Sequence, residues 1–166
     1  LAFEKYLSLI NFDDADIIIS GPNSRFCFFL SRFLSEYSNS ITFVGSSLHY
    51  DTSHPYISAD NFIKIERMNL LPAKYHSGFD TYGGDVLSAM LKSIHPQGSL
   101  FSVGNSKDSH ISTSILPLIL RGVSLIGINA ETSSSLTCTS FWTDAIDRLW
   151  SPYFNQQFET VSLSQF

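Results

Sequence analysis

Short apolar runs alternate with longer amphipathic segments along this chain of 166 residues. The clearest example lies near the beginning, where the β-branched run at residues 17–19 indicates a buried strand and residues 21–23 a turn. A helix is predicted from Ser24 to about Tyr37, because Ser24 is a favourable N-terminal cap. Its apolar face is formed by Cys27, Phe28, Leu30 and Leu34. Together these residues predict a strand, a tight turn and a helix over residues 15–37.

The same pattern predicts the remaining elements. Further strands are expected at residues 41–45, 61–65, 78–82, 99–103 and 123–128, with a last short strand at 159–163. Amphipathic helices are expected at residues 1–10, 85–94 and 139–150. The apolar segment 115–120 carries Pro117, which suits the first turn of a short helix better than a central strand.

The order of these elements predicts the fold class. Strands separated by helix-length segments indicate parallel pairing through right-handed crossovers, and nearly continuous apolar strands fit a sheet covered on both faces. The length suits one domain with a substantial core. We therefore predict a single Rossmann-like α/β domain over residues 1–166, with a doubly wound parallel sheet of about six strands.

Composition and charge exclude several classes of function. The net charge of −5 argues against a nucleic-acid surface, which needs basic side chains to neutralise phosphates. No apolar run reaches the ~20 residues of a membrane-spanning helix. The two cysteines, Cys27 and Cys138, are too few and too far apart for a disulfide scaffold or a zinc site. We expect a cytoplasmic protein without nucleic-acid or membrane partners and, since the chain has no initiator methionine, a fragment of a longer protein.

Few side chains suggest chemistry of their own. The five histidines show no metal-ligand spacing, so no metal site is expected; they are His49, His54, His76, His95 and His110. Asp80 ends a predicted strand beside two glycines, which fits a catalytic carboxylate but fits a turn-stabilising one better. Cys27 lies in an aromatic cluster, which favours a small buried residue over a reactive thiol.

The second half of the chain resembles the medium-chain dehydrogenase/reductase superfamily. The nearest match is the zinc-independent quinone oxidoreductase group, which includes NADPH-dependent acrylyl-CoA reductases. In that group an Asp-Thr-Val-Gly-Gly segment ends the fourth strand, where this chain has Asp-Thr-Tyr-Gly-Gly at residues 80–84. A Pro-Phe-Ile-Leu-Arg segment precedes the sixth strand, where this chain has Pro-Leu-Ile-Leu-Arg at residues 117–121. The resemblance extends over nearly the whole chain and is strongest after Ser77.

The resemblance implies the Rossmann cofactor domain of an NADPH-dependent reductase that transfers hydride to an activated alkene or quinone. The GroES-like domain, which supplies much of the substrate pocket in this family, is absent from the sequence. The implied cofactor-binding positions are Gly21, Asn23, Ser24, Arg25, Ser46, Ser47, Tyr82, Gly83, Gly104, Asn105 and Asn129. The resemblance assigns no catalytic residue and no metal to this domain.

The phosphate-binding half of the implied site departs from the family. Its glycine-rich turn matches residues 20–28, where only Gly21 remains. Arg25 either binds a phosphate directly or is a solvated arginine at the start of a helix. Ser46 and Ser47 stand where the family holds the 2′-phosphate of NADPH with a small and a basic residue.

Two functions follow from the sequence. One is a reductase cofactor domain that holds NADPH; the other is a degenerate Rossmann domain that acts as a structural or protein-interaction module without a nucleotide. The segment 123–129 also has two interpretations. As in the resembling family, it can pair with its two-fold mate in a homodimer, or it can be an edge strand covered by the helix at 139–150.

Overall fold

The computed structural model describes residues 15–35, 38, 40–49, 53–64, 69–129 and 143. Apart from Thr143, these residues belong to one compact unit, Ala2–Glu131, and the description below concerns that unit. The helix predicted at 1–10 and the strand predicted at 159–163 lie outside the described residues, as does the helix predicted at 139–150 except for Thr143. The prediction of one domain across residues 1–166 stays a prediction.

Six parallel strands form one sheet in the order β3-β2-β1-β4-β5-β6. The strands are β1 (Asp16–Ser20), β2 (Ser40–Gly45), β3 (Tyr56–Ser58), β4 (Tyr75–Asp80), β5 (Ile94–Ser102) and β6 (Ser124–Gly127). Ile18 in the central strand β1 pairs with Thr42 of β2 on one side and with Gly78 of β4 on the other. This strand order is that of doubly wound Rossmann domains, so the predicted fold class is confirmed.

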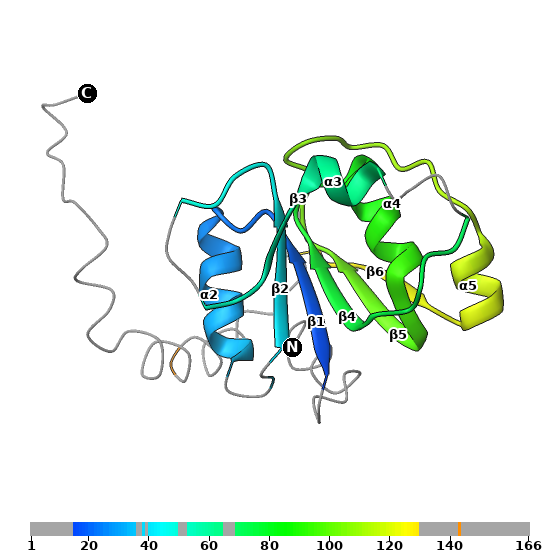
Figure 1. Ribbon diagram of the computed structural model, residues 1–166, viewed down its shortest axis with the longest axis horizontal. Helices are drawn as coiled ribbons and strands as arrows, with labels where there is room; N and C mark the ends of the chain where they lie inside the picture. Colours follow the sequence, from blue (N-terminus) through cyan, green and yellow to red (C-terminus); the bar gives the residue numbers. More distant parts are fainter. Residues whose placement is uncertain are drawn as a thin grey trace, which may run out of the picture. The chain divides into compact units, whose positions relative to one another are not determined.

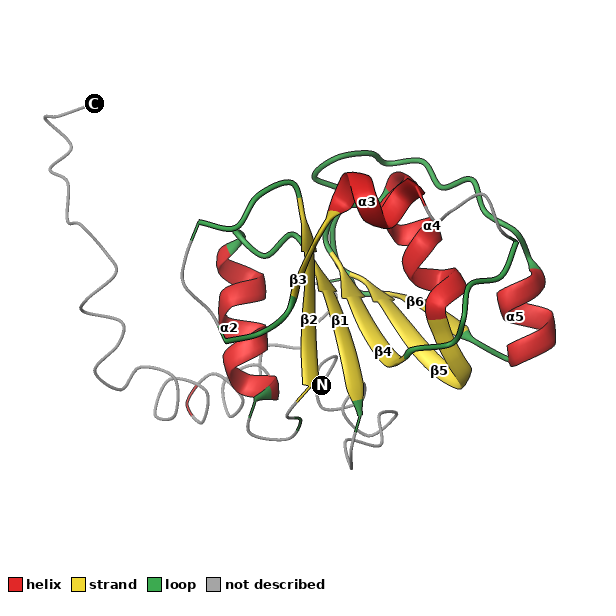
Figure 2. Ribbon diagram, viewed as in Figure 1, coloured by secondary structure: helices red, strands yellow, loops and turns green. Residues whose placement is uncertain are grey.

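Helices cover both faces of the sheet (Figures 1 and 2). They are α2 (Arg25–Leu34) on one face and α3 (Ala59–Lys64), α4 (Gly84–Ser93) and α5 (Leu116–Arg121) on the other. Successive side chains of a strand point to opposite faces. Ile17 and Ile19 therefore pack in the cluster with Leu30 and Leu34 of α2, whereas Ile18 packs in the cluster with Met90 of α4. None of the described helices is long and apolar enough to cross a membrane.

The strand predicted at residues 61–65 is wrong, because α3 occupies residues 61–64 and the third strand is β3. The Ser58 hydroxyl accepts a hydrogen bond from the Asn61 amide at 3.3 Å, as a residue before a helix does. Ala59 and Phe62, three residues apart, are both buried, which places them on one helical face. The apolar residues in this short run therefore follow the helical period rather than the alternation of a strand.

Two further boundaries differ from the predictions. β4 begins at Tyr75 and ends at Asp80 rather than spanning residues 78–82. β5 begins at Ile94, directly after α4, and ends at Ser102 rather than spanning residues 99–103. The pairing register of these two strands shifts between Tyr75 and Ser77, and Gln97 has a φ of 63°. The other strands and helices predicted within residues 15–129 are confirmed, with ends that move by a few residues.

The guanidinium of Arg121 fixes the end of α5 against the rest of the fold. It donates hydrogen bonds to the carbonyls of Lys92 at 2.9 Å and Ile94 at 3.2 Å, and a third to the carbonyl of Leu71. The first two carbonyls belong to the junction between α4 and β5. One side chain therefore joins three segments that are distant in the sequence.

Candidate functional site

The predicted site residues lie at one end of the sheet, in the loops and at the helix start that follow the strands, because every strand is parallel and ends there. In doubly wound sheets ligands bind at this edge, where the strand order reverses, which is between β1 and β4 in this chain. Gly21, Asn23, Ser24 and Arg25 follow β1; Ser46 and Ser47 follow β2; Tyr82 and Gly83 follow β4; Gly104 and Asn105 follow β5; Asn129 follows β6. The topology therefore places these residues at the edge where a nucleotide would bind.

The turn after β1 is built around Gly21. Its φ of +72° lies in the left-handed region, and a Cβ at this position would lie 2.2 Å from the Thr81 Oγ1. Only glycine fits this turn without strain. Ser24 then caps α2 as predicted, since its hydroxyl accepts a hydrogen bond from the Cys27 amide at 3.1 Å.

Cys27 fills the space between the start of α2 and the end of β1. Its side chain is fully buried, and its Sγ donates a hydrogen bond to the Ser20 carbonyl at 3.0 Å. Burial raises the pKa of this thiol above its ordinary value of 9.0, so it remains protonated at neutral pH. The prediction of a small buried residue is confirmed. The cysteine occupies a position where the resembling family has a glycine.

Asp80 holds the turn that follows β4. Its carboxylate is fully buried and accepts hydrogen bonds from the Ser20 hydroxyl at 2.6 Å and from the amides of Tyr82 at 3.2 Å and Gly83 at 2.8 Å. Burial raises the pKa of Asp80 above its ordinary value of 3.8, and these hydrogen bonds oppose the rise. The structure thus confirms the turn-stabilising role that the sequence favoured for this carboxylate.

The amide of Asn23 ties the loop after β1 to the loop after β2. Its Nδ2 donates to the carbonyl of Ser47 at 3.0 Å and lies 3.1 Å from the Ser47 hydroxyl, and its Oδ1 accepts from the His49 amide at 2.9 Å. Arg25, the first residue of α2, and Ser46 are exposed at the same edge. Side chains of the protein therefore bridge the two loops that would face the phosphates of a nucleotide.

Tyr82 joins the loop after β4 to the loop after β2. Its side chain is 9% exposed, and its hydroxyl accepts a hydrogen bond from the amide of Ser46 at 3.2 Å. Two carbons of its ring lie 3.0 and 3.2 Å from the position of a Cβ on Gly21. The ammonium of Lys107 lies 5.6 Å from the ring centroid. The ring thus lies directly over the turn that follows β1.

Gly83 and Gly84 make room for the loop that follows β5. Their φ angles are +76° and +56°, and a Cβ on Gly83 would lie 2.0 Å from the Asp108 carbonyl oxygen. The amides of Lys107 and Asp108 donate to the Tyr82 carbonyl at 3.0 and 3.1 Å. The two glycines therefore serve a close approach between two segments of the backbone, in addition to the turn that the sequence predicted.

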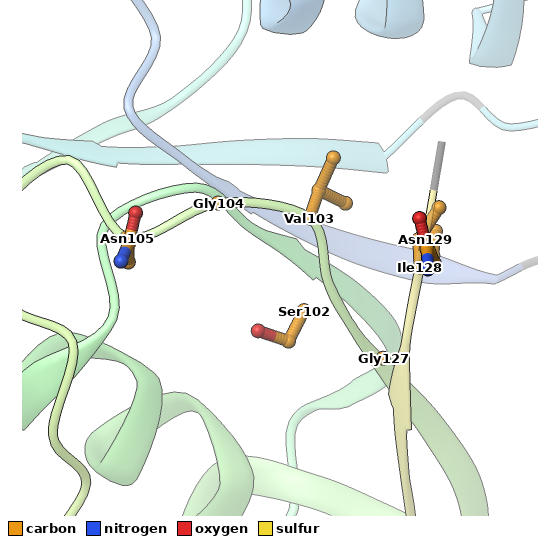
Figure 3. A pocket seen from close by; sticks show the side chains of 7 residues that line it. All are labelled: Ser102, Val103, Gly104, Asn105, Gly127, Ile128 and Asn129. Carbon is orange, nitrogen blue, oxygen red and sulfur yellow. The ribbon is translucent and has the colours of Figure 1, made fainter. Parts of the chain in front are cut away.

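A pocket of about 490 Å³ opens between the ends of β5 and β6 (Figure 3). It is lined by Ser102, Val103, Gly104, Asn105, Gly127, Ile128 and Asn129. The structure thus brings the predicted residues Gly104, Asn105 and Asn129 to one pocket. Sequence reasoning missed Ser102 and Val103, although their position just before Gly104 at a strand end was a usable signal. The pocket is a shallow depression, open to solvent, that combines amide and hydroxyl groups with two aliphatic side chains.

The five histidines do not come together as a metal site. The rings of His76 and His95 stack with their centroids 4.5 Å apart, and the amide of Asp16 donates to the His76 Nδ1 at 3.1 Å. Within the described part of the chain, no group of three or more histidine, cysteine, aspartate or glutamate residues has an arrangement that would hold a metal ion.

Fold and site together define a Rossmann-like α/β domain whose open pocket lies at the carboxyl ends of β5 and β6. Solved structures with this fold include Escherichia coli K-12 YhdH with bound NADPH, at 20% identity and a TM-score of 0.82. The match covers 99% of this chain and 53% of that chain. No family model and no curated protein matches this chain.

Two further solved structures share the fold. The yhdH oxidoreductase from Salmonella enterica in complex with NADP matches at 20% identity and a TM-score of 0.75, covering 88% of this chain and 48% of that one. Bacillus subtilis yhfP with NAD bound matches at 17% identity and a TM-score of 0.74, covering 90% of this chain and 46% of that one. The chain thus spans about half the length of the structures it matches. At these identities the likeness establishes the fold, in agreement with the resemblance drawn from the sequence.

Proposed function

We propose that this chain is the cofactor domain of an oxidoreductase that uses a reduced nicotinamide nucleotide and is related to the quinone and enoyl-type reductases. The observation that carries the proposal is the pocket at the ends of β5 and β6 in a sheet of Rossmann order. The nucleotide-bound structures with the same fold support it. When bound, the nucleotide supplies the hydride that reduces an activated alkene or quinone.

The residues of this chain fit one half of such a nucleotide. The polar groups that could meet the carboxamide of a nicotinamide ring are the side chains of Asn105, Asn129 and Ser102. Aliphatic contact to the ring could come from Val103 and Ile128. The phosphate half does not fit, because Tyr82 and Asn23 occupy the space over the turn that follows β1 and the loop that follows β2. We therefore assign the chain the task of orienting the nicotinamide ring and derive no chemical step through the nucleotide.

Calorimetric titration of the 166-residue chain tests this assignment. NADPH, NADH and reduced nicotinamide mononucleotide would each be titrated into the wild type and into Asn105→Ala/Asn129→Ala. We expect the mononucleotide to bind, and the double substitution to weaken its binding about tenfold, which corresponds to ~1.4 kcal/mol. Asn61→Ala, an exposed asparagine of α3, is the matched control and should change nothing. Equal binding by the wild type and the double variant would exclude the pocket as the site.

A second function remains supported by one observation. The hydrogen bonds of Tyr82 and Asn23 join the loops to one another in place of a nucleotide. They favour a Rossmann domain that binds no nucleotide and acts as a structural or protein-interaction module. The absence of heat with all three nucleotides, on protein shown to be folded, would favour this module. The cytoplasmic location and the missing GroES-like domain remain predictions beside either function.

We also propose that β6 mediates a homodimer. β6 lies at the end of the sheet order, and three of its four residues are exposed. Large apolar side chains are exposed on β6, on α5 and on the residue before α5, namely Leu125 (38%), Ile119 (63%), Leu120 (65%) and Ile115 (62%). An uncovered apolar edge of this kind favours pairing with a second sheet.

Sedimentation analysis of the wild type and of Ile119→Lys/Leu120→Lys tests the dimer. The proposal expects a dimer that the double substitution converts to a monomer, since two charges would be buried at the interface. Asp60→Lys, at an exposed position of α3, also raises the net charge by two and is the control for the change in charge. A monomeric wild type at all concentrations would favour the alternative in which another part of the chain covers this edge.

A further inference from the structure

Tyr82 crosses the end of the central strand. It lies two residues beyond Asp80, the last residue of β4, and its hydroxyl meets the amide of Ser46, the first residue beyond β2. β1 lies between these two strands, which are two strand spacings apart, ~10 Å, so the Tyr82 side chain and its hydrogen bond to Ser46 together cross the end of β1. This is the point of the edge where doubly wound sheets bind the middle of a dinucleotide.

The tyrosine is held in this position from several sides. Its amide donates to Asp80, and its carbonyl accepts from the amides of Lys107 and Asp108. The Lys107 ammonium lies over the ring from the loop after β5. Because its backbone and its ring are both held, Tyr82 can move away from Ser46 only by breaking its hydrogen bonds and its contact with Lys107.

Asn23 extends the same closure toward β2. Its side-chain amide links the turn after β1 to Ser47 and His49. The loops after β1, β2 and β4 are therefore joined twice, by a phenol and by an amide. On the other side of β4, the pocket at the ends of β5 and β6 is lined without either bridge.

We propose that Tyr82 is a specificity-determining residue that restricts this edge to ligands of nicotinamide mononucleotide length. It excludes the adenosine phosphate half of a dinucleotide. The inference rests on the proposed function, since it takes the pocket between β5 and β6 as the place of the nicotinamide ring. The resembling family has valine at this position of its Asp-Thr-Val-Gly-Gly segment. The substitution Tyr82→Val therefore removes the phenol while leaving an apolar residue in the turn.

A purely structural role for Tyr82 makes a different prediction. The ring belongs to the apolar cluster that includes Val86 and Leu87, so its loss lowers stability in either case. A structural role predicts that Tyr82→Val leaves the ratio of the NADPH and mononucleotide affinities unchanged. A selecting role predicts that this ratio changes, because a dinucleotide binds only the fraction of molecules in which the crevice is open.

The experiment titrates NADPH and reduced nicotinamide mononucleotide into the wild type, Tyr82→Val and Tyr56→Phe. Tyr56 is the matched control, because its hydroxyl donates to the Gly45 carbonyl at 2.7 Å at the same end of β2 without crossing β1. We expect wild type and Tyr56→Phe to bind NADPH no more tightly than the mononucleotide. We expect Tyr82→Val to bind NADPH at least about tenfold more tightly than wild type, with the mononucleotide affinity unchanged.

The outcomes separate the inference from the function on which it rests. If the mononucleotide binds and NADPH binds wild type and Tyr82→Val equally, the inference is overturned and the proposed function stands. Wild type that binds NADPH more tightly than the mononucleotide also overturns the inference and leaves the proposed function standing. If neither ligand binds any of the proteins, both the inference and the proposed function fall.

A second measurement keeps the inference testable if Tyr82→Val does not fold. Ser46 is exposed, yet its amide donates to the Tyr82 hydroxyl. Hydrogen exchange at the Ser46 amide should therefore be slow in wild type and should become about tenfold faster in Tyr82→Phe, which keeps the ring and loses the acceptor. Unchanged exchange in Tyr82→Phe would show that the bridge is not formed in solution and would overturn the inference.

Discussion

At the carboxyl ends of the strands, the half of the sheet formed by β1 and β2 differs from the half formed by β5 and β6. Over β1 and β2, side chains of the protein bind one another: Tyr82 meets Ser46, and Asn23 meets Ser47. Past β4, the ends of β5 and β6 line an open pocket. A glycine on each side shows the contrast. A Cβ on Gly21 would lie 2.2 Å from Thr81, whereas a Cβ on Gly127 would meet no atom of the described chain within 4 Å.

This difference separates what the backbone decides from what the side chains decide. The parallel sheet brings all the loops to one edge whatever their sequence, so the topology alone places a potential site there. Which part of the edge accepts a ligand depends on individual residues in those loops. The fold therefore provides the place of a potential site, and in our proposal the residues after β1, β2 and β4 decide which ligand enters.

Among single substitutions near the ends of β1, β2 and β4, Asp80→Ala should lower the free energy of unfolding the most. It leaves the Ser20 hydroxyl and the amides of Tyr82 and Gly83 without their common acceptor in a buried place. We expect the free energy of unfolding to fall by about 3 kcal/mol. Urea unfolding measures this loss. Asp85→Ala, an exposed carboxylate in the first turn of α4, is the control and should cost less than ~1 kcal/mol. A loss of similar size in both variants would contradict the role assigned to Asp80.

Gly21→Ala and Gly127→Ala compare the two sides directly. Gly21→Ala should destabilise the protein by about 2 kcal/mol, through its positive φ and its clash with Thr81. Gly127→Ala should stay within ~0.5 kcal/mol. Thr81→Ala combined with Gly21→Ala should recover the part due to the clash and leave the part due to the backbone angle. Equal losses for the two single glycine variants would remove the contrast between the closed side and the open side.

Asn23→Ala and Asn105→Ala compare two exposed amides at the same edge. The amide of Asn23 joins two loops, so its removal should lower the free energy of unfolding by about 1 kcal/mol. Asn105 lines the open pocket, and its removal should change stability by less than ~0.5 kcal/mol. Thermal unfolding of both variants measures the difference. A larger loss for Asn105→Ala would mean that the open side is the better-ordered one.

The pH dependence of stability sharpens the account of Asp80 with the smallest effect. Its pKa in the folded protein is raised above the ordinary value of 3.8, chiefly by burial. The folded state therefore retains this proton to higher pH than the unfolded state does. The stabilisation linked to that proton is complete below the ordinary pKa and is lost as the pH rises through the folded pKa. Relative to Asp80→Asn, wild type should lose stability as the pH rises from about 3.8. Urea unfolding from about pH 4 upward checks the sign, and a rising difference would contradict it.

Most of the fold could be predicted because its signals are local. The run at residues 17–19, the Ser24 cap and Pro117 each determine an element through neighbouring residues, and all three predictions are confirmed. The prediction for the segment 61–65 failed because five residues, of which three are apolar, fit a helix and a strand about equally, and the deciding cap at Ser58 lies outside the segment. Where β5 begins depends on its pairing with β4, which no local pattern contains.

The candidate site could be predicted only in part for the same reason. The sequence placed Asn105 and Asn129 beyond strand ends, and parallel pairing brings those ends together. The direction of the Tyr82 side chain depends on Ser46, 36 residues away. That contact exists only after β1, β2 and β4 have come together, so spacing along the chain gives no sign of it. The closure of the crevice is therefore a property of the tertiary structure.

The three hydrogen bonds of Arg121 bear on the order in which the domain assembles. Its partners Leu71, Lys92 and Ile94 are 50, 29 and 27 positions away, so these bonds form only after long loops have closed. Contacts made late in folding affect the unfolding rate more than the folding rate. Removing the guanidinium should therefore shorten the lifetime of the native state while leaving the speed of folding nearly intact. Arg121 therefore slows unfolding by holding α5 against the completed sheet.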